Sequence, residues 1–440
     1  MNKLLEFCNY IASLSGNQLD VPRAREIVKV INDFLYANYE GIGYTQALGR
    51  TYSYFSDFHK FWEQHHRDIL ECRINDVACE SVADALHNVY LHTNGTAFSE
   101  LYDKCGLTNQ EVCKIRLLTA NQDFRGSLNF KELSEVYKND PSVFDLKDMA
   151  TYPEKFLRDT KLINLSQTDK RSQYVKNIAQ FYLSHNCEPY EILSKYDNDL
   201  IKFRHALINC AGAGFGNKKA DMVIRDMIVM GIWKNYTGFD TIEVASDVNT
   251  MHVALRTGII TTAIPLVSSF LDIFCHQYAY IDDMNAMAWR RVWEIWRIKY
   301  PYESIESPCL LDYFIYNVVG KQFCKPSLYV YQCETEKHYF RWHSGMNRTC
   351  QICYKANKGR PVASPVERKL PCCDDEGYIA IMQTPYVKSL PNNQKINECP
   401  FSKLCKKRNL KSPKSISIEG RTGWVTAYTK IGEGGGGLMS

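Results

Sequence analysis

A glycine-dense turn between two segments of helical periodicity constrains the fold of this chain more than any other feature. The turn spans residues 210–216 and contains three glycines. Apolar residues recur at the spacing of one helix face before the turn and again after it. Glycines can adopt φ > 0, and the N–H groups that begin the next helix can bind an anion. The sequence therefore predicts two helices joined by a hairpin over residues 207–228, with Gly214, Gly216 and Asn217 at its anion-binding turn.

An acidic residue at the start of a later helix gives the second signal. Asp247 precedes a segment of helical periodicity that ends at Gly258. The helix dipole favours a negative charge at such a position, so we expect this carboxylate to be ionised. A single acid or lysine at a helix start is usually only solvated, so neither signal indicates a function by itself.

Together the two stretches resemble the helix-hairpin-helix DNA glycosylases, the superfamily of endonuclease III and 8-oxoguanine DNA glycosylase. The family's hairpin reads Leu-Pro-Gly-hydrophobic-Gly-x-Lys-x-Ala, and residues 214–220 match it from the first glycine onward. Its second block, which begins Val-Asp-Thr-His, aligns with residues 247–258. The resemblance implies that Lys218 is the nucleophile of a lyase and that Asp247 is the catalytic aspartate.

The chain also departs from the family pattern. Gly212 and Ala213 replace Leu-Pro, Asn249 stands at the His position, and the segment between Lys218 and Asp247 is longer than in endonuclease III. An amine is nucleophilic only when it is unprotonated, and we expect burial and the charge of Lys219 to lower the pKa of Lys218. A shift of one residue in the alignment would exchange the roles of the two lysines.

The stretch 112–122 is similar to the helix and loop that carry the wedge of endonuclease III. In that family a polar amide enters the duplex where the target base has been extruded. The resemblance implies that Asn121 or Gln122 has this role. An ordinary polar loop is the alternative.

The resemblance implies an all-α chain with a two-lobed glycosylase core. The composition, 45% hydrophobic and 23% charged, is that of an ordinary globular protein. The predicted order is an N-terminal helical extension (1–105), a six-helix barrel with the hairpin (106–235), a second helical lobe that carries the catalytic acid (236–323), a Cys-rich metal-binding region (324–411) and a tail (412–440).

Cysteines are concentrated towards the C-terminus, where eight of the 17 lie between residues 324 and 405. In an intracellular chain this density indicates metal ligation rather than disulfides. The resemblance to endonuclease III implies a [4Fe-4S] cluster. Its expected ligands are Cys324, Cys399 and Cys405, with a fourth from Cys372 or Cys373.

A zinc site is the alternative or addition to the cluster. Thiolates and imidazoles are the usual ligands of structural zinc. The residues that could hold it are Cys333, Cys350, Cys353, His338 and His343.

Basic charge is concentrated in the same region. The whole chain has a net charge of only +4, but residues 324–414 contain 17 Lys and Arg against 7 Asp and Glu. We expect Lys406, Lys407 and Arg408, beside the metal loop, to contact DNA phosphates.

The implied function is that of a DNA glycosylase, bifunctional with abasic-site lyase activity. It would flip a modified base out of double-stranded DNA and cleave the N-glycosidic bond. Base excision repair and anti-phage defence, by removal of hypermodified bases such as glucosylated hydroxymethylcytosine, are both compatible with the resemblance. The alternative is a non-catalytic DNA-binding protein that retains the hairpin and the metal loop. The sequence shows neither a signal peptide nor a membrane span, which predicts a cytoplasmic, nucleoid-associated monomer.

Overall fold

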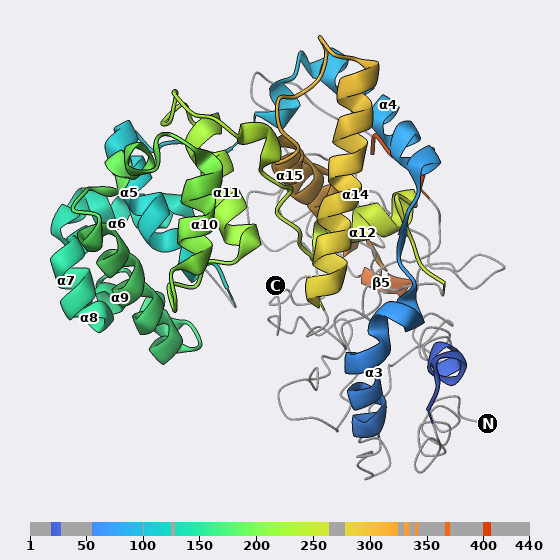
Figure 1. Ribbon diagram of the computed structural model, residues 1–440, viewed down its shortest axis with the longest axis horizontal. Helices are drawn as coiled ribbons and strands as arrows, with labels where there is room; N and C mark the ends of the chain where they lie inside the picture. The colour runs from blue at the N-terminus through green and yellow to red at the C-terminus, as the bar shows by residue number, and fades with distance from the viewer. Residues whose placement is uncertain are drawn as a thin grey trace.

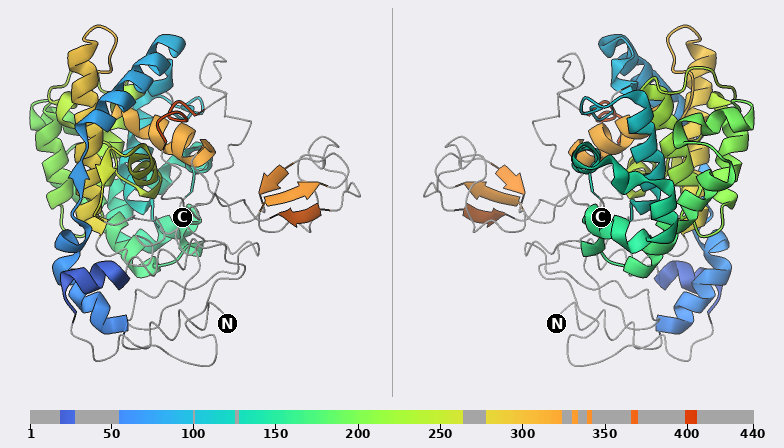
Figure 2. Two further views of the ribbon diagram at one scale, coloured as in Figure 1. Left: turned by 90° about the vertical axis from the view of Figure 1, so that its right-hand side faces the viewer. Right: turned by 90° about the vertical axis from the view of Figure 1, so that its left-hand side faces the viewer.

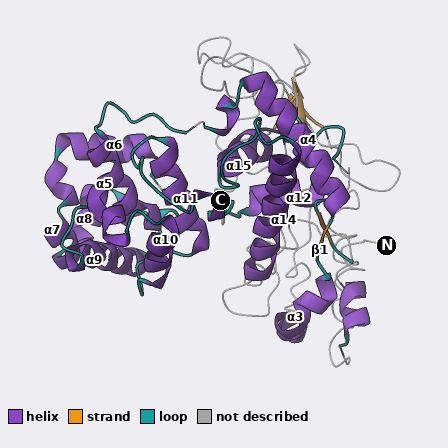
Figure 3. Ribbon diagram, turned by 45° about the horizontal axis from the view of Figure 1, so that its top comes forward, coloured by secondary structure: helices purple, strands orange, loops and turns teal. Residues whose placement is uncertain are grey.

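The chain is mostly helical in the computed structural model (Figure 1). The structure describes residues 19–27, 55–99, 101–124, 128–263, 278–323, 330–333, 339–341, 366–369 and 399–405. Coloured by secondary structure, these residues are nearly all helix and connecting loop (Figure 3). The all-α prediction is therefore confirmed at this level.

One group of helices, at the left of Figure 1, extends from α5 to α11. Its core is a single apolar cluster in which Leu118, Ile178, Leu207 and Ile224 are fully buried. The group comprises α5 (Asn109–Thr119), η2 (Ala120–Gln122), α6 (Phe130–Asn139), η3 (Pro141–Phe144), α7 (Leu146–Thr151), α8 (Pro153–Asp159), η4 (Leu162–Asn164), α9 (Thr168–Ser184), η5 (Pro189–Tyr196), α10 (Leu200–Asn209) and α11 (Asn217–Val229).

A second group, at the right of Figure 1, contains the longest described helix, α14 (Tyr278–Lys299). Its other helices are α3 (Phe55–Leu70), α4 (Asp76–Thr93), η1 (Thr96–Phe98), α12 (Val248–Thr257), α15 (Leu310–Tyr313) and the π-helix η8 (Phe314–Phe323). The short helix η6 (Phe239–Thr241) lies on the connection from α11 to α12.

Helices α4 and α14 pack side by side although they are far apart in sequence. Arg291 of α14 donates two hydrogen bonds to Asp76, at 2.9 and 3.0 Å. Lys299, the last residue of α14, forms ion pairs with Asp84 and Glu80. Residues 76–93, which the sequence analysis assigns to an N-terminal extension, therefore pack in the same group as the helix with the candidate catalytic acid.

Three tryptophans of α14 form the centre of this second group. Trp289 and Trp296 are fully buried and Trp293 is only 4% exposed, so all three are core residues. Each indole N–H donates to a backbone carbonyl, so burial leaves no polar atom of these rings unsatisfied.

Strands are few and short. β1 (Arg73–Ile74) pairs with β2 (Ile260–Thr261), and the antiparallel register places Arg73 opposite Thr261. A separate sheet has β3 (Val330–Cys333) between β4 (Tyr339–Arg341) and β5 (Val366–Lys369), both antiparallel to it. This sheet stands apart from the helical body (Figure 2). Among the described helices, none combines the length and apolar character needed to cross a membrane.

Candidate functional site

The predicted hairpin is present between α10 and α11, and its turn depends on two glycines. Gly212 has φ +69° and Gly214 has φ +78°, whereas Gly216 has an extended backbone with φ −117° and is the N-cap of α11. The left-handed conformation is therefore adopted at Gly212 and Gly214, and Gly216 does not adopt it. A Cβ at Gly214 would clash with the ring of Tyr174, so only glycine allows the turn to pack on α9.

Side chains from two other elements hold the hairpin turn in place. Asn177 of α9 donates to the carbonyl of Ala211 at 3.0 Å. Asn121 of η2 donates to the carbonyls of Ala213, at 3.0 Å, and Tyr174, at 3.1 Å. The turn is thus fixed to both α9 and η2, while Gly216 and Asn217 are exposed at the start of α11.

The two candidate wedge residues lie in the interior. Asn121 is 0% exposed and Gln122 is 1% exposed. The amide of Gln122 donates to the carbonyls of Arg171 and of the Asn121 side chain. A side chain that must enter a duplex has to reach the protein surface, so this placement argues against a wedge role for either amide. The next half-exposed side chains of the turn are Asp123 and Phe124.

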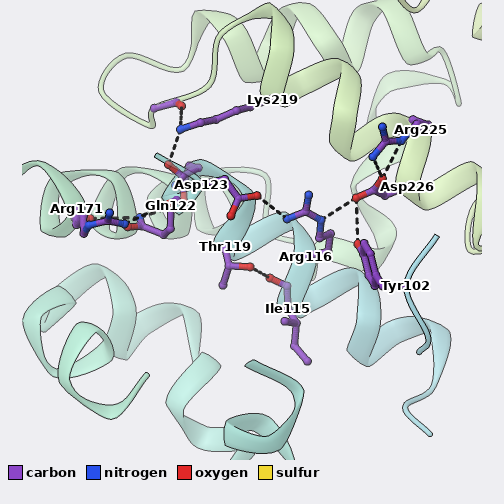
Figure 4. A network of polar contacts seen from close by, with 12 residues as sticks. Tyr102, Ile115, Arg116, Thr119, Gln122, Asp123, Arg171, Lys219, Arg225 and Asp226 are labelled. Atoms are coloured by element: carbon purple, nitrogen blue, oxygen red, sulfur yellow. Dashed lines mark hydrogen bonds and ion pairs between the residues drawn. The ribbon is translucent and has the colours of Figure 1, made fainter. Parts of the chain in front are cut away.

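Lys219 ties the hairpin to the η2 turn (Figure 4). Its Nζ donates to the carbonyl of Asn121 at 2.7 Å and to that of Gly214 at 3.3 Å. The same ammonium lies over the rings of Phe124, 4.9 Å from the centroid, and Tyr174, 5.7 Å from the centroid. Burial lowers the pKa of Lys219 to about 8, despite the opposing charge of Asp123.

Lys218 lies in a different environment, because it is exposed at the second residue of α11. The expectation that Lys218 is buried is therefore wrong. Burial and the lowered pKa belong to Lys219, for which the charge of Lys218 is a minor cause of the shift. Successive residues of a helix point about 100° apart, which is why the two lysines face different neighbours.

Asp247 caps the N-terminus of α12, as the sequence predicts. Its Oδ1 accepts the backbone N–H of Thr250 at 2.8 Å, and the Thr250 hydroxyl in turn accepts the N–H of Asp247. Its Oδ2 accepts from the Asn249 amide at 3.1 Å. These bonds fix the half-buried carboxylate in one orientation at the positive end of a helix dipole.

One stripe of α11 faces α5 and is closed by buried ion pairs (Figure 4). Asp226, seven residues after Lys219, accepts from Arg116 at 2.8 Å, from Arg225 at 2.6 Å and from the Tyr102 hydroxyl at 3.0 Å. Although burial opposes ionisation, Arg225 and Arg116 hold the pKa of Asp226 below its usual value. The fully buried carboxylate thus remains charged and fixes the helix against α5.

The neighbouring stripe of α11 faces the segment α15–η8. Arg225, seven residues after Lys218, forms an ion pair with Asp312 of α15. Residues seven apart lie on the same side of an α-helix, so Lys218 is on the side of α11 that faces this segment. Further along the segment, Gly320 of η8 approaches Asn249, where an added Cβ would come within 2.8 Å of the Asn249 Cβ.

Lys218 and Asp247 are brought near the same side chain by these contacts. Tyr316 lies on η8 between Asp312 and Gly320. Burial raises the pKa of Tyr316, the negative charge of Asp247 raises it further, and the positive charge of Lys218 opposes the shift. Both candidate catalytic groups therefore act electrostatically on one phenol, although they are far apart in sequence.

Only part of the proposed metal region can be placed. Cys399 is buried and Cys405 half-buried, and they bracket a tight turn in which Cys405 N donates to the Phe401 carbonyl. Phe401 packs on Trp289, so the turn is anchored to α14.

Most of the other predicted metal ligands lie outside the described residues. Cys333 is described and ends β3. Those that lie outside are Cys324, Cys350, Cys353, Cys372, Cys373, His338 and His343. Within the described part of the chain no complete set of metal ligands is present. Lys406, Lys407 and Arg408 also lie outside the described residues.

No family model matches the chain, and no curated protein matches it. The functional assignment therefore depends on the motif residues and on their geometry.

Proposed function

We propose that the protein is a DNA glycosylase with abasic-site lyase activity, and that Lys218 and Asp247 are its catalytic pair. The observation that supports this most directly is that the segment α15–η8 contacts both helices, through the ion pair of Asp312 with Arg225 on the side of Lys218 and through the approach of Gly320 to Asn249 beside Asp247. In this proposal the α5–α11 group and the group around α14 correspond to the two lobes of a helix-hairpin-helix glycosylase. The deoxyribose would occupy the space where α11 and α12 begin.

The proposed reaction uses the two side chains in distinct roles. The unprotonated amine of Lys218 attacks C1′ of the extruded nucleotide, the C1′–N bond breaks, and the base leaves with the bonding electron pair and a proton. The C1′–O4′ bond then breaks, O4′ takes up a proton, and the nitrogen forms a Schiff base with C1′. Loss of a proton from C2′ breaks the C3′–O bond, so that β-elimination cuts the strand on the 3′ side of the abasic site. Asp247 stabilises the positive charge that develops on the sugar, and its two hydrogen bonds orient the carboxylate before reaction.

Binding of the duplex is proposed to use the exposed end of the hairpin. The backbone N–H groups at Gly216 and Asn217 begin α11 and can bind a phosphate. Lys170 of α9 is exposed. It lies beside the hairpin, because its Nζ is 5.7 Å from the ring centroid of Tyr174, and that ring packs against Gly214. The metal loop, with either a [4Fe-4S] cluster or zinc, would add basic contacts, but no step of the proposed reaction passes through a metal.

The wedge is proposed to be Phe124 in place of the buried amides. This ring is half-exposed at the end of the η2 turn, and Tyr174 contacts it edge-on at 5.5 Å between centroids. Arg171 packs over it at 4.2 Å. An aromatic ring can stack on the bases that flank an extruded nucleotide, and such stacking does not depend on base identity.

A non-catalytic DNA-binding protein is the second candidate, and one observation favours it. Lys218 is exposed, so the described residues do not desolvate its amine in the absence of DNA. In that case the hairpin would bind duplexes and no base would be released.

The test is a panel of duplexes with oxidised, damaged or hypermodified bases, incubated with protein and borohydride. We expect a trapped covalent complex on at least one duplex, lost in Lys218→Gln and retained in Lys219→Gln. The duplex that reacts also distinguishes repair substrates from glucosylated phage bases. Duplex binding without base release from any member of the panel would contradict the enzyme proposal, and loss of the complex only in Lys219→Gln would exchange the two lysines.

A further inference from the structure

The π-helix η8 connects the two helices that carry the proposed catalytic pair. Its preceding helix, α15, is joined to α11 through Asp312 and Arg225, and η8 itself approaches α12 at Gly320 and Asn249. A π-helix of ten residues is rare, and such wide turns are frequent at functional sites. The fold therefore places an unusual backbone segment directly beside the candidate site.

Tyr316 is on the side of this segment that faces the site. It lies four residues after Asp312 and four before Gly320, close to one turn of a π-helix in each direction, so the three positions lie on about the same side of the segment. Asp312 contacts α11 and Gly320 contacts the start of α12, so a side chain midway between them faces the region between those helices. Tyr316 is half-buried there.

The charged groups around Tyr316 determine what its hydroxyl can do. Asp247 and Asp123 raise its pKa in addition to burial, and Lys218 and Arg225 oppose them. A phenol is protonated at neutral pH even at its ordinary pKa, and these groups raise the pKa further, so the hydroxyl can donate a hydrogen bond. Two charges of each sign surround the hydroxyl, and the edge of a nucleobase is a neutral partner that carries acceptor atoms for such a donor.

We propose that Tyr316 is a third residue of the site, whose ring packs against the extruded base and whose hydroxyl donates a hydrogen bond to it. The inference rests on the proposed glycosylase function. The bond would strengthen as the base accepts the electron pair of the C1′–N bond, because a charge-assisted hydrogen bond is stronger than a neutral one. Tyr316 would therefore assist base release and have no part in the lyase step, when the base has already left.

The test compares two substrates in Tyr316→Phe, which retains the ring and removes the hydroxyl. The first is the modified-base duplex that the wild type processes fastest, and the second is the same duplex with an abasic site. We expect single-turnover base release to fall about ten- to a hundredfold. Cleavage at the abasic site should stay at the wild-type rate. Tyr313→Phe, on the same helical segment and with its ring 5.9 Å from the Arg225 guanidinium, is the matched control and should match the wild type on both substrates.

Each other outcome has a definite meaning. Base release at the wild-type rate in Tyr316→Phe, or an equal loss on both substrates with unchanged duplex affinity, would overturn the proposed contact with the base. In both cases the wild type remains active, so the glycosylase proposal stands. If the wild type releases no base and forms no trapped complex, the glycosylase proposal and the role of Tyr316 fail together.

Discussion

The two faces of α11 differ in environment although they belong to the same short helix. On the face towards α5, Lys219 and Asp226 are enclosed, and every charge has a partner within hydrogen-bonding distance. On the face towards η8, Arg225 is paired but Lys218 is exposed at the helix start. The difference suggests that the first face holds the hairpin rigid, so that the second can present an amine to a ligand.

This division separates a buried lysine with structural contacts from the exposed lysine that we propose as the nucleophile. A lowered pKa is often taken to identify a catalytic amine. Here the lowered pKa belongs to Lys219, whose Nζ already donates to two carbonyls and lies over two aromatic rings. The lowered pKa of Lys219 is therefore a consequence of its burial in the structure. We base the choice of the proposed nucleophile on which lysine faces the segment that also contacts the start of α12, and that lysine is Lys218.

The largest expected effect is on the face of α11 towards α5. Asp226→Asn removes the charge that compensates Arg116 and Arg225, and leaving buried guanidinium groups without their counterion costs about 3–5 kcal/mol. We expect the free energy of unfolding in urea to fall by that amount. Asp197→Asn, which breaks the exposed pair with Lys202, is the control and should leave the unfolding midpoint unchanged. Equal stability of the two variants would contradict the structural role of the face towards α5.

The next effect is on chemistry alone. Asp247→Asn retains an oxygen that can accept the N–H of Thr250, and Asn caps helices as well as Asp does. We therefore expect unchanged stability and a loss of base release of about 10²–10³-fold, the range for removing one preorganised electrostatic contact. Asp199→Asn makes the same change at the N-cap of α10 and should retain full activity. Retention of the wild-type rate in Asp247→Asn would contradict the proposed catalytic role of Asp247.

The sequence predicts the local parts of this arrangement well. The apolar spacing places α10 and α11, and Asp247 is the N-cap of α12, because helix phase and capping depend on residues within a few positions.

Contacts between distant residues could not be predicted in this way. Nothing near Lys219 in the sequence indicates that its amine meets the carbonyl of Asn121, 98 positions earlier. Contacts with α9 and the hairpin likewise hold the η2 turn, so the amides predicted to be wedge residues lie in the interior. One further signal was available: Lys218 and Arg225 are seven residues apart, as are Lys219 and Asp226, and this phase already places the two lysines on different faces.

A smaller effect should distinguish the lysines by pH. Lys219 has a pKa of about 8 in the folded protein and an ordinary value near 10.5 when unfolded. Between these values the unfolded chain binds more protons, so this residue makes the free energy of unfolding rise with pH. Relative to Lys219→Met, the wild type should gain about 2 kcal/mol between pH 7 and 10. Lys218→Met is the control and should follow the wild type; a parallel profile for Lys219→Met would show that this amine is not buried.

The smallest expected effect concerns the proposed wedge, Phe124. It tests whether the residues that pack around Lys219 also contact the DNA duplex. Phe124→Ala removes a ring whose stacking on a base is worth about 1–3 kcal/mol, so base release from duplex DNA should fall about tenfold. Arg171 and Lys219 pack on the same ring, and the variant could also loosen the hairpin. Single-stranded DNA of the same sequence separates the two causes, because an unpaired base needs no wedge to stay extruded. A loss confined to duplex DNA supports the wedge, whereas an equal loss on both substrates assigns Phe124 to the support of the hairpin. Tyr302→Ala, which removes a ring that is 95% exposed in the other helical group, should leave both rates unchanged.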